Sequence, residues 1–243
     1  GNIAIGDSVG SAITSGDNAV AIGRDALKGV YTGGDAIAIG RSALTALTSG
    51  NNNVAVGTFG LGANTTGGDN TAIGYAALGE NTTASDNTAV GSSALNANTT
   101  GTRNTSIGKD ALKANTTAAD NTAVGYQAAY TNTTGTANTI VGHKAWYGGT
   151  GNYNSVFGHT AYRDGGAGAN NAAFGYASMA NNTGNHNAAF GNQSVQTNTS
   201  GEYNTGVGSF SLFSNTTASN NTAVGYDALK LNTTGADNTA EGA

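Results

Sequence analysis

Apolar residues recur along the chain in groups of three, and the spacing of these groups is regular. In the first repeats the groups read Ile3-Ala4-Ile5, Val20-Ala21-Ile22, Ile37-Ala38-Ile39 and Val54-Ala55-Val56, with 17 residues between equivalent positions. Alternation with a period of two residues is typical of a β-strand. The intervening segments are rich in Asn, Thr and Gly, which are weak helix formers. The pattern therefore predicts one short strand in each repeat.

A glycine follows every strand group and marks the repeat. The step between these glycines is 17 residues and shortens to 16 before Gly158 and Gly191. The positions are Gly6, Gly23, Gly40, Gly57, Gly74, Gly91, Gly108, Gly125, Gly142, Gly158, Gly175, Gly191, Gly208 and Gly225, with Gly242 in a degenerate last copy. Repeats of this length that cannot form a helical pair are typical of solenoids. We expect residues 1–243 to form a single all-β domain, a parallel β-solenoid of about 15 coils without a linker or cap.

Two further columns are expected to fill the interior of each coil. The residue just before the glycine is Ile, Val or Phe in almost every repeat, and the residue four positions after it is usually large and apolar. The second column holds Leu27, Leu44, Leu61, Leu78, Leu95, Leu112, Leu212 and Leu229, with Trp146, Tyr162, Met179 and Val195 between them. The Ala-Leu pairs, such as Ala94-Leu95, suggest a second short strand. The Asn-Thr-Thr-Gly segments suggest a corner, because Asn and Gly tolerate positive φ.

The composition agrees with a thin coil. Leu, Ile, Val and Phe make up about 15% of the chain, the net charge is −5, and charged residues are 9%. That is too little apolar mass for an ordinary globular core and too little charge to hold a chain open. In-register asparagines at the corners, for example Asn64, Asn81 and Asn98, are expected to stack as amide ladders.

The first four strand groups are apolar on both faces, although only one face can point into the coil. Strands buried on both faces need cover on the outer side, and a partner chain along the solenoid is the simplest cover. Neither end carries a polar capping unit, so we expect the array to belong to a longer fibre or to stack end to end.

The segments Asn2–Gly6, Ala19–Gly23 and Ala36–Gly40 resemble the YadA-like head repeats of trimeric autotransporter adhesins. The later copies, as in Asn121–Gly135 and Asn221–Gly235, look like the arrays of tail-fibre-like proteins of phages and bacterial surfaces. The resemblance covers nearly the whole chain. It implies a left-handed β-roll, a homotrimer, and a role as the head or shaft of an adhesive fibre at a cell surface or on a virion. The 17-residue period is longer than the usual repeat of that family, and Thr replaces the first apolar strand position from Thr71 onward.

Several residues are candidates for specific chemistry. His143 and His159 follow the glycine in adjacent coils and are expected to stack about 4.8 Å apart, as a metal pair, a pH-sensitive pair or an outward column. The aromatic zone of Trp146, Tyr147 and Tyr153 suggests a ligand patch, while Phe157, Phe174 and Phe190 are interpreted as refilling the shorter coils. Eight corners match an N-glycosylation acceptor, at Asn64, Asn81, Asn98, Asn115, Asn132, Asn198, Asn215 and Asn232. The corner chemistry also explains these asparagines without glycans. The acidic positions Asp17, Asp69, Asp86, Asp120 and Asp237 are interpreted as a solvated edge, because single carboxylates lack the ligand density of a calcium loop.

These patterns favour a structural role. A thin, filled coil offers no pocket with converging titratable groups, so we expect no catalytic residues, no cofactor and no metal. An isoelectric point near 4.9 argues against nucleic acid as a partner, and no apolar run reaches the roughly 18 residues of a membrane span. The leading interpretation is an adhesive extracellular fibre segment whose partners are copies of itself and a host or matrix surface ligand. The alternatives are a self-assembling filament subunit without a ligand, and an ice-binding solenoid, which would require outward Thr-x-Thr pairs on a flat strand.

Overall fold

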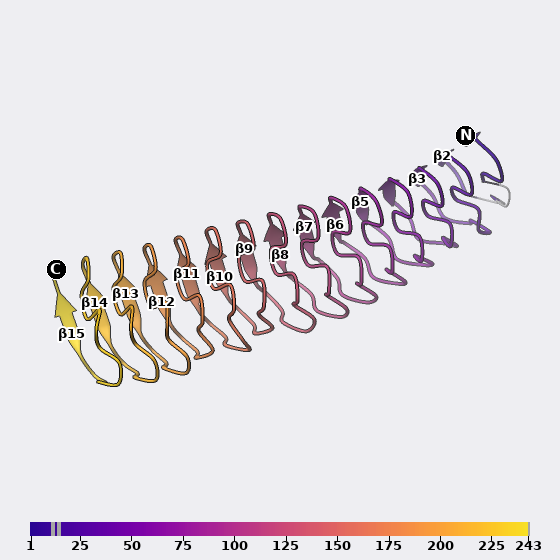
Figure 1. Cartoon of the computed structure of the whole chain (residues 1–243). Coiled ribbons are helices and arrows are strands. Elements are labelled where there is room, and N and C mark those ends of the chain that lie inside the picture. Colours follow the sequence, from indigo (N-terminus) through magenta and orange to yellow (C-terminus); the bar gives the residue numbers. More distant parts are fainter. Residues whose placement is uncertain (11–12, 14–15, 243) are drawn as a thin grey trace. The chain divides into compact units, whose positions relative to one another are not determined.

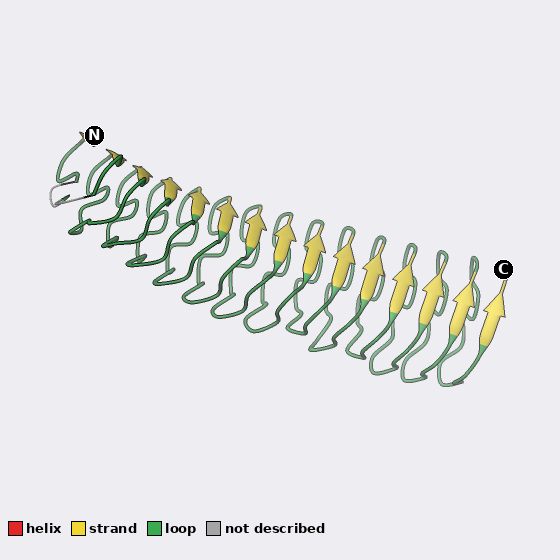
Figure 2. Ribbon diagram, turned by 180° about the vertical axis from the view of Figure 1, so that it is seen from behind, coloured by secondary structure: helices red, strands yellow, loops and turns green. Residues whose placement is uncertain are grey.

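The computed structural model describes residues 1–10, 13 and 16–242. The chain forms two compact units, Gly1–Asn121 (unit 1) and Thr122–Ala243 (unit 2). Within the described residues the secondary structure consists of short parallel strands joined by turns (Figure 2). These residues contain no helix, and hence none that could cross a membrane.

Each unit is a parallel β-solenoid with one three-residue strand per turn, as predicted (Figure 1). Unit 1 contains β1 (Ile3–Ile5), β2 (Val20–Ile22), β3 (Ile37–Ile39), β4 (Val54–Val56), β5 (Thr71–Ile73), β6 (Thr88–Val90) and β7 (Thr105–Ile107). Unit 2 contains β8 (Thr122–Val124), β9 (Thr139–Val141), β10 (Ser155–Phe157), β11 (Ala172–Phe174), β12 (Ala188–Phe190), β13 (Thr205–Val207), β14 (Thr222–Val224) and β15 (Thr239–Glu241). Within each unit the strands pair in chain order, and equivalent residues lie opposite one another, for example Ala72 and Ala89.

The interior of each coil is built from small and medium apolar side chains. The middle residue of the strand points inward and is fully buried, as at Ala55, Ala89 and Ala173. The residue four positions after the glycine is also fully buried, from Leu27 to Leu212. Leu229, near the end of unit 2, is half-buried. Because strand side chains alternate between faces, an inward Ala places the residue before the glycine outside the coil.

The outward position of that residue corrects one expectation. The side chains of the column just before the glycine are half-buried or exposed, for example Ile73 and Val224. They do not fill the interior. Ala is the commonest inward strand residue because the coil is narrow and a methyl group packs against the Leu column in most turns. Ile140 and Val156 hold the same inward position in unit 2.

The turns rely on the left-handed region of φ, at positions other than those expected. The repeat glycines have strongly positive φ, as at Gly91 (φ +132°), where a Cβ would lie 2.7 Å from the backbone of Gly108. Non-glycine residues in the same turn also have positive φ, namely Ser93 (55°) and Leu95 (50°). The Ala-Leu pairs therefore form turns and not a second strand. The Asn-Thr-Thr-Gly corner, by contrast, has no positive φ at Asn98 or Gly101.

Two columns of asparagine complete the interior. The first is the Asn64 ladder, in which Asn81 Nδ2 donates to Asn64 Oδ1 (3.1 Å), and the next two members repeat the bond at 3.0 and 2.9 Å. The predicted stacking of these amides is confirmed, but they lie inside the coil and not on its surface. The second is the Asn70 ladder, immediately before the strands, in which Asn70 Nδ2 donates to Asn53 Oδ1 (3.2 Å) and to Ala84 O (2.9 Å). The Asn64 amides thus bond to a neighbouring turn and to the backbone of their own turn, whereas Asn70 bonds to the turns on both sides of it; in both ladders the buried amide groups are hydrogen-bonded.

Candidate functional site

The outward strand face is the most continuous surface feature of each unit. We define it as the first and third residues of every strand, which project away from the coil. In β1 to β4 both columns are Ile or Val, and Ile3, Ile5 and Ile37 are classed as exposed, with 52%, 58% and 37% of their surface accessible. A continuous apolar column of this kind differs from single exposed hydrophobic residues, which need no explanation. This face is a candidate for association with another chain.

From β5 onward the outward strand face changes character. Its first column is mostly Thr, while its third column is Ile, Val or Phe up to β14 and Glu241 in β15. In unit 2 the rings of Phe157 and Phe174 stack at 4.7 Å, and those of Phe174 and Phe190 stack at 5.0 Å. These phenylalanines form a ladder on the outside of the coil. The interpretation that they refill the shorter coils is therefore wrong, because their side chains point away from the interior.

The proposed aromatic patch does not exist as one surface. Trp146 is fully buried in the column that elsewhere holds Leu, and its indole Nε1 has no hydrogen-bond partner. Tyr147 stacks on Tyr130 with ring centroids 5.0 Å apart, whereas Tyr153 is exposed near the start of the next turn. The interior position of the indole leaves no shared face for a ligand at Trp146, Tyr147 and Tyr153. The large ring stands where other turns have Leu95 or Leu112.

The two histidines stack as expected. The ring centroids of His143 and His159 are 4.7 Å apart with planes inclined by 7°. Tyr126 and Tyr176 extend the stack on either side, at 5.3 and 5.7 Å. Among the described residues no group of three or more His, Cys, Asp or Glu side chains could hold a metal ion. The pair is thus part of an exposed aromatic column.

Most asparagines of the N-glycosylation acceptors lie where a glycan cannot be accommodated. Seven of the eight are fully buried, and the Nδ2 atom that would carry the sugar is a hydrogen-bond donor inside the coil. Asn98, for example, donates to Gly101 O at 2.9 Å and to Asn81 Oδ1 at 3.0 Å. Only Asn232 is half-exposed among these residues. The folded coil therefore disfavours the glycosylation hypothesis at the seven buried sites.

The shifted pKa values of ionisable side chains have simple physical causes. Arg103 Nε lies 2.6 Å from Asp120 Oδ1 on the surface of unit 1, and this hydrogen bond lowers the pKa of the Asp120 carboxyl. Burial raises the pKa of Tyr31 to about 12. Burial also raises the pKa of Tyr162, whose hydroxyl accepts hydrogen bonds from Asn171 (3.0 Å) and Asn182 (3.2 Å). Both tyrosines are structural, because each hydroxyl is committed to the interior of its coil.

Unit 1 carries a groove that the sequence pattern does not single out. It has a volume of about 660 Å³ and follows the turns after β3 to β7. We call it the unit 1 groove. Its lining includes Gly62, Gly79, Phe59, Tyr75 and Asn96. A signal was available in the sequence: two successive repeats carry glycine five positions after the repeat glycine, where the neighbouring turns have Thr45 and Asn96.

Comparison with family models, with curated proteins and with solved structures finds no match to this chain. The resemblance to adhesin heads and tail fibres therefore rests on the repeat residues alone.

Proposed function

We propose that the chain is a non-enzymatic structural and adhesive segment of an extracellular fibre, assembled as a homotrimer through the outward strand faces. The observation that carries the proposal is the unbroken double column of Ile and Val on β1 to β4. The resemblance of these segments to trimeric adhesin heads supports three copies, a left-handed winding and a location on a cell surface or a virion. A continuous backbone ladder supplies the stiffness that such a fibre needs, since each turn is hydrogen-bonded to its neighbours.

The energetics favour association through this face. Full burial of an Ile or Val side chain contributes roughly 1.5–3 kcal/mol. The side chains of β1 to β4 are already partly covered by their neighbours, so each retains roughly 1 kcal/mol to gain on association. Eight such side chains per chain contribute about 8 kcal/mol, which is of the same order as the cost of about 4–15 kcal/mol for lost translational and rotational freedom.

The oligomeric state tests this proposal directly. We expect native mass spectrometry of the full chain to give three copies, and Ile37→Lys to yield monomers because it places a charge in the middle of the shared face. Val30→Lys is the matched control, because Val30 is also exposed but lies outside the strands. A monomeric wild-type chain, or a trimer that tolerates Ile37→Lys, would contradict assembly through this face.

Two alternatives remain as outcomes of other experiments. A filament subunit without a ligand would form longer assemblies visible in negative stain above a threshold concentration. An ice-binding solenoid would show thermal hysteresis. The outward strand face from β5 to β8 pairs Thr with Val or Ile, as at Thr88 and Val90, and does not pair Thr with Thr. In addition, the corner threonines use their hydroxyls internally, since Thr82 Oγ1 donates to Thr99 O at 3.1 Å.

A further inference from the structure

The unit 1 groove exists because two side chains are missing from one column. The fifth residue after the repeat glycine lies on the surface, and in most turns it is larger than Ala. At Gly62 and Gly79 the column is empty for two successive turns, and Ala63 and Ala76 beside them are small. The resulting hollow of about 660 Å³ is within the usual range for ligand sites.

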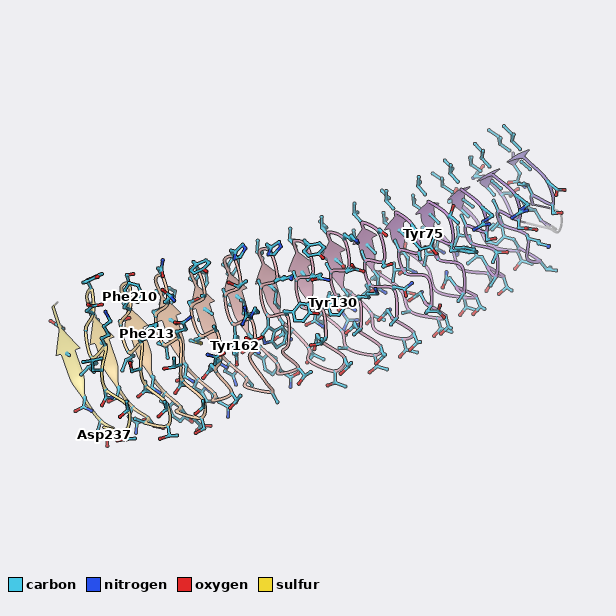
Figure 3. All side chains as sticks on the ribbon, viewed as in Figure 1. Tyr75, Tyr130, Tyr162, Phe210, Phe213 and Asp237 are labelled. Carbon is cyan, nitrogen blue, oxygen red and sulfur yellow. The ribbon has the colours of Figure 1, made fainter. Side chains whose placement is uncertain are left out.

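Unit 2 provides an internal comparison that isolates the role of these glycines. Tyr75 meets Phe59 edge-on, with ring centroids 6.2 Å apart, and Tyr226 meets Phe210 in the same way at 6.2 Å. Around the second pair, however, Phe213 occupies the position equivalent to Gly62 (Figure 3). Lys230 occupies the position equivalent to Gly79. The ring of Phe213 lies 5.8 Å from that of Phe210, and Lys230 Nζ lies 4.9 Å from the Phe210 centroid. Each unit thus has its own Phe-Tyr pair of this geometry. The hollow beside the pair in unit 1 accompanies glycine at positions 62 and 79.

The lining of the groove combines an exposed aromatic ring with neutral hydrogen-bonding groups. Tyr75 is 56% exposed, while Phe59 is partly covered by the Arg41 guanidinium, 4.8 Å from its centroid. Asn96 Nδ2 donates to Ala76 O at 2.9 Å across the groove, which fixes the orientation of the amide. The other neutral polar side chains along the groove are Ser42, Thr45 and Ser93.

The charges at the groove are few and partly neutralised. Lys113 Nζ lies 3.0 Å from Asp110 Oδ1, and Glu80 is the acidic residue among the lining side chains. Strongly anionic ligands therefore meet no concentrated positive field. No Leu, Ile, Val or Met side chain lines the groove, so it lacks the aliphatic pocket that would receive an apolar peptide side chain.

A neutral carbohydrate matches this combination. Sugar rings have apolar faces that pack on aromatic side chains, and their hydroxyls exchange hydrogen bonds with amides and hydroxyls. We propose that the unit 1 groove binds a neutral oligosaccharide, with its sugar rings against Tyr75 and its hydroxyls bonded to Asn96 and the neighbouring hydroxyl side chains. This site would bind the surface ligand that the adhesive function proposed above requires. The inference rests on that adhesive function and not on the trimer.

A glycan array probed with the full chain tests the proposal, followed by isothermal titration with the soluble form of the glycan bound best. The array carries neutral hexasaccharides, including cellohexaose and maltohexaose, and sulfated hexasaccharides as the anionic comparison. We expect binding to a neutral glycan, a loss of at least tenfold in affinity for Tyr75→Ala, and no measurable binding for Gly79→Lys. Lys230 occupies the equivalent position in unit 2, so this backbone path accepts a lysine. A Cβ at Gly79 would lie 2.7 Å from Asn96 Nδ2 and 3.3 Å from Ala76 O, so the substitution also displaces the Asn96 amide from its bond to Ala76 O.

Tyr226→Ala is the matched control, because Tyr226 is similarly exposed and meets Phe210 in the same geometry, but has Phe213 and Lys230 where the unit 1 groove has Gly62 and Gly79. It should bind like the wild-type chain. The proposal is overturned if no neutral glycan on the array binds, if only sulfated glycans bind, or if Gly79→Lys binds like the wild type while circular dichroism shows the same fold. Native mass spectrometry of the same samples separates the two proposals, since a trimer without glycan binding removes the saccharide site and leaves the fibre.

Discussion

The Asn64 ladder gives a prediction that can be worked out bond by bond at Asn98. Its Nδ2 donates to Gly101 O (2.9 Å) and Asn81 Oδ1 (3.0 Å), and its Oδ1 accepts from Asn115 Nδ2 (2.9 Å). Asn98→Ala removes all three hydrogen bonds and leaves their partners buried and unpaired at those bonds. A hydrogen bond contributes about 1 kcal/mol net, and an unpaired buried group costs about 1–3 kcal/mol. Since Asn115 keeps its bond to Ala118 O, we expect a total loss of roughly 3–5 kcal/mol.

Urea denaturation followed by circular dichroism measures this loss as a lower transition midpoint. Stability in a repeat array is partly local, so hydrogen exchange should be measured alongside it. Exchange should accelerate most for amides in the turns containing Asn81, Asn98 and Asn115.

Asn192→Ala is the control, because Asn192 is exposed and its side chain makes no hydrogen bond within the described residues. Its effect should stay within about 0.5 kcal/mol. If Asn98→Ala unfolds at the same urea concentration as Asn192→Ala, the buried amide ladder does not stabilise the coil and the reasoning fails.

Three further predictions concern the interior and the turns. Trp146→Phe should keep the melting temperature or raise it, because it removes the unpaired buried Nε1, whereas Trp146→Ala should cost about 3–5 kcal/mol of cavity and transfer energy. Gly91→Ala should lower the free energy of unfolding by about 3 kcal/mol, because Gly91 combines a positive φ with a backbone clash for any Cβ. Gly62 has no positive φ, so Gly62→Ala should lower it by less than about 1 kcal/mol. Equal urea midpoints for the two variants would contradict this reasoning. The raised pKa values of Tyr31 and Tyr162 mean that their contribution to stability is complete below the unfolded pKa of about 10 and is lost as the pH rises through the folded values. Urea midpoints should therefore fall between about pH 10 and pH 12, and Tyr162→Phe should show a smaller fall along with lower stability at neutral pH.

The repeat length and the strand positions could be predicted from the sequence because they depend on one periodic signal. The spacing of Val20, Ile37 and Val54 sets the register of β2, β3 and β4 directly. Which strand face points inward could not be settled in the same way. Both faces are apolar in these strands, and hydrophobicity favours Ile over Ala for the interior. The narrow coil reverses that preference in most turns, where the inward position holds Ala, although Ile140 and Val156 occupy it in unit 2.

The backbone conformations of the turns could not be predicted from the sequence, for a different reason. Propensity assigns positive φ to Gly and Asn, yet Leu95 and Ser93 adopt it here while Asn98 does not. Such a conformation costs roughly 1–2 kcal/mol for an ordinary residue. Ladder hydrogen bonds to neighbouring turns, such as Leu95 N to Ala111 O at 2.9 Å, offset the cost. No single repeat contains these bonds, so local propensity cannot reveal them.

Inward and outward positions of the repeat differ in how freely their side chains can vary, and this difference indicates where such a solenoid can acquire binding specificity. The inward Ala, Leu and Asn columns are tied to packing and to amide ladders, so substitutions there affect folding first. The fifth position after the repeat glycine accepts side chains from Gly62 to Phe213 on the same backbone path. Residues at this position line hollows of different size: Gly62 and Gly79 accompany a groove of about 660 Å³, Ala180 accompanies one of about 140 Å³, and Tyr147 and Arg163 line one of about 270 Å³. Because size at one surface column changes the hollow without touching the interior, ligand sites in this solenoid can change by single substitutions while the fold is preserved.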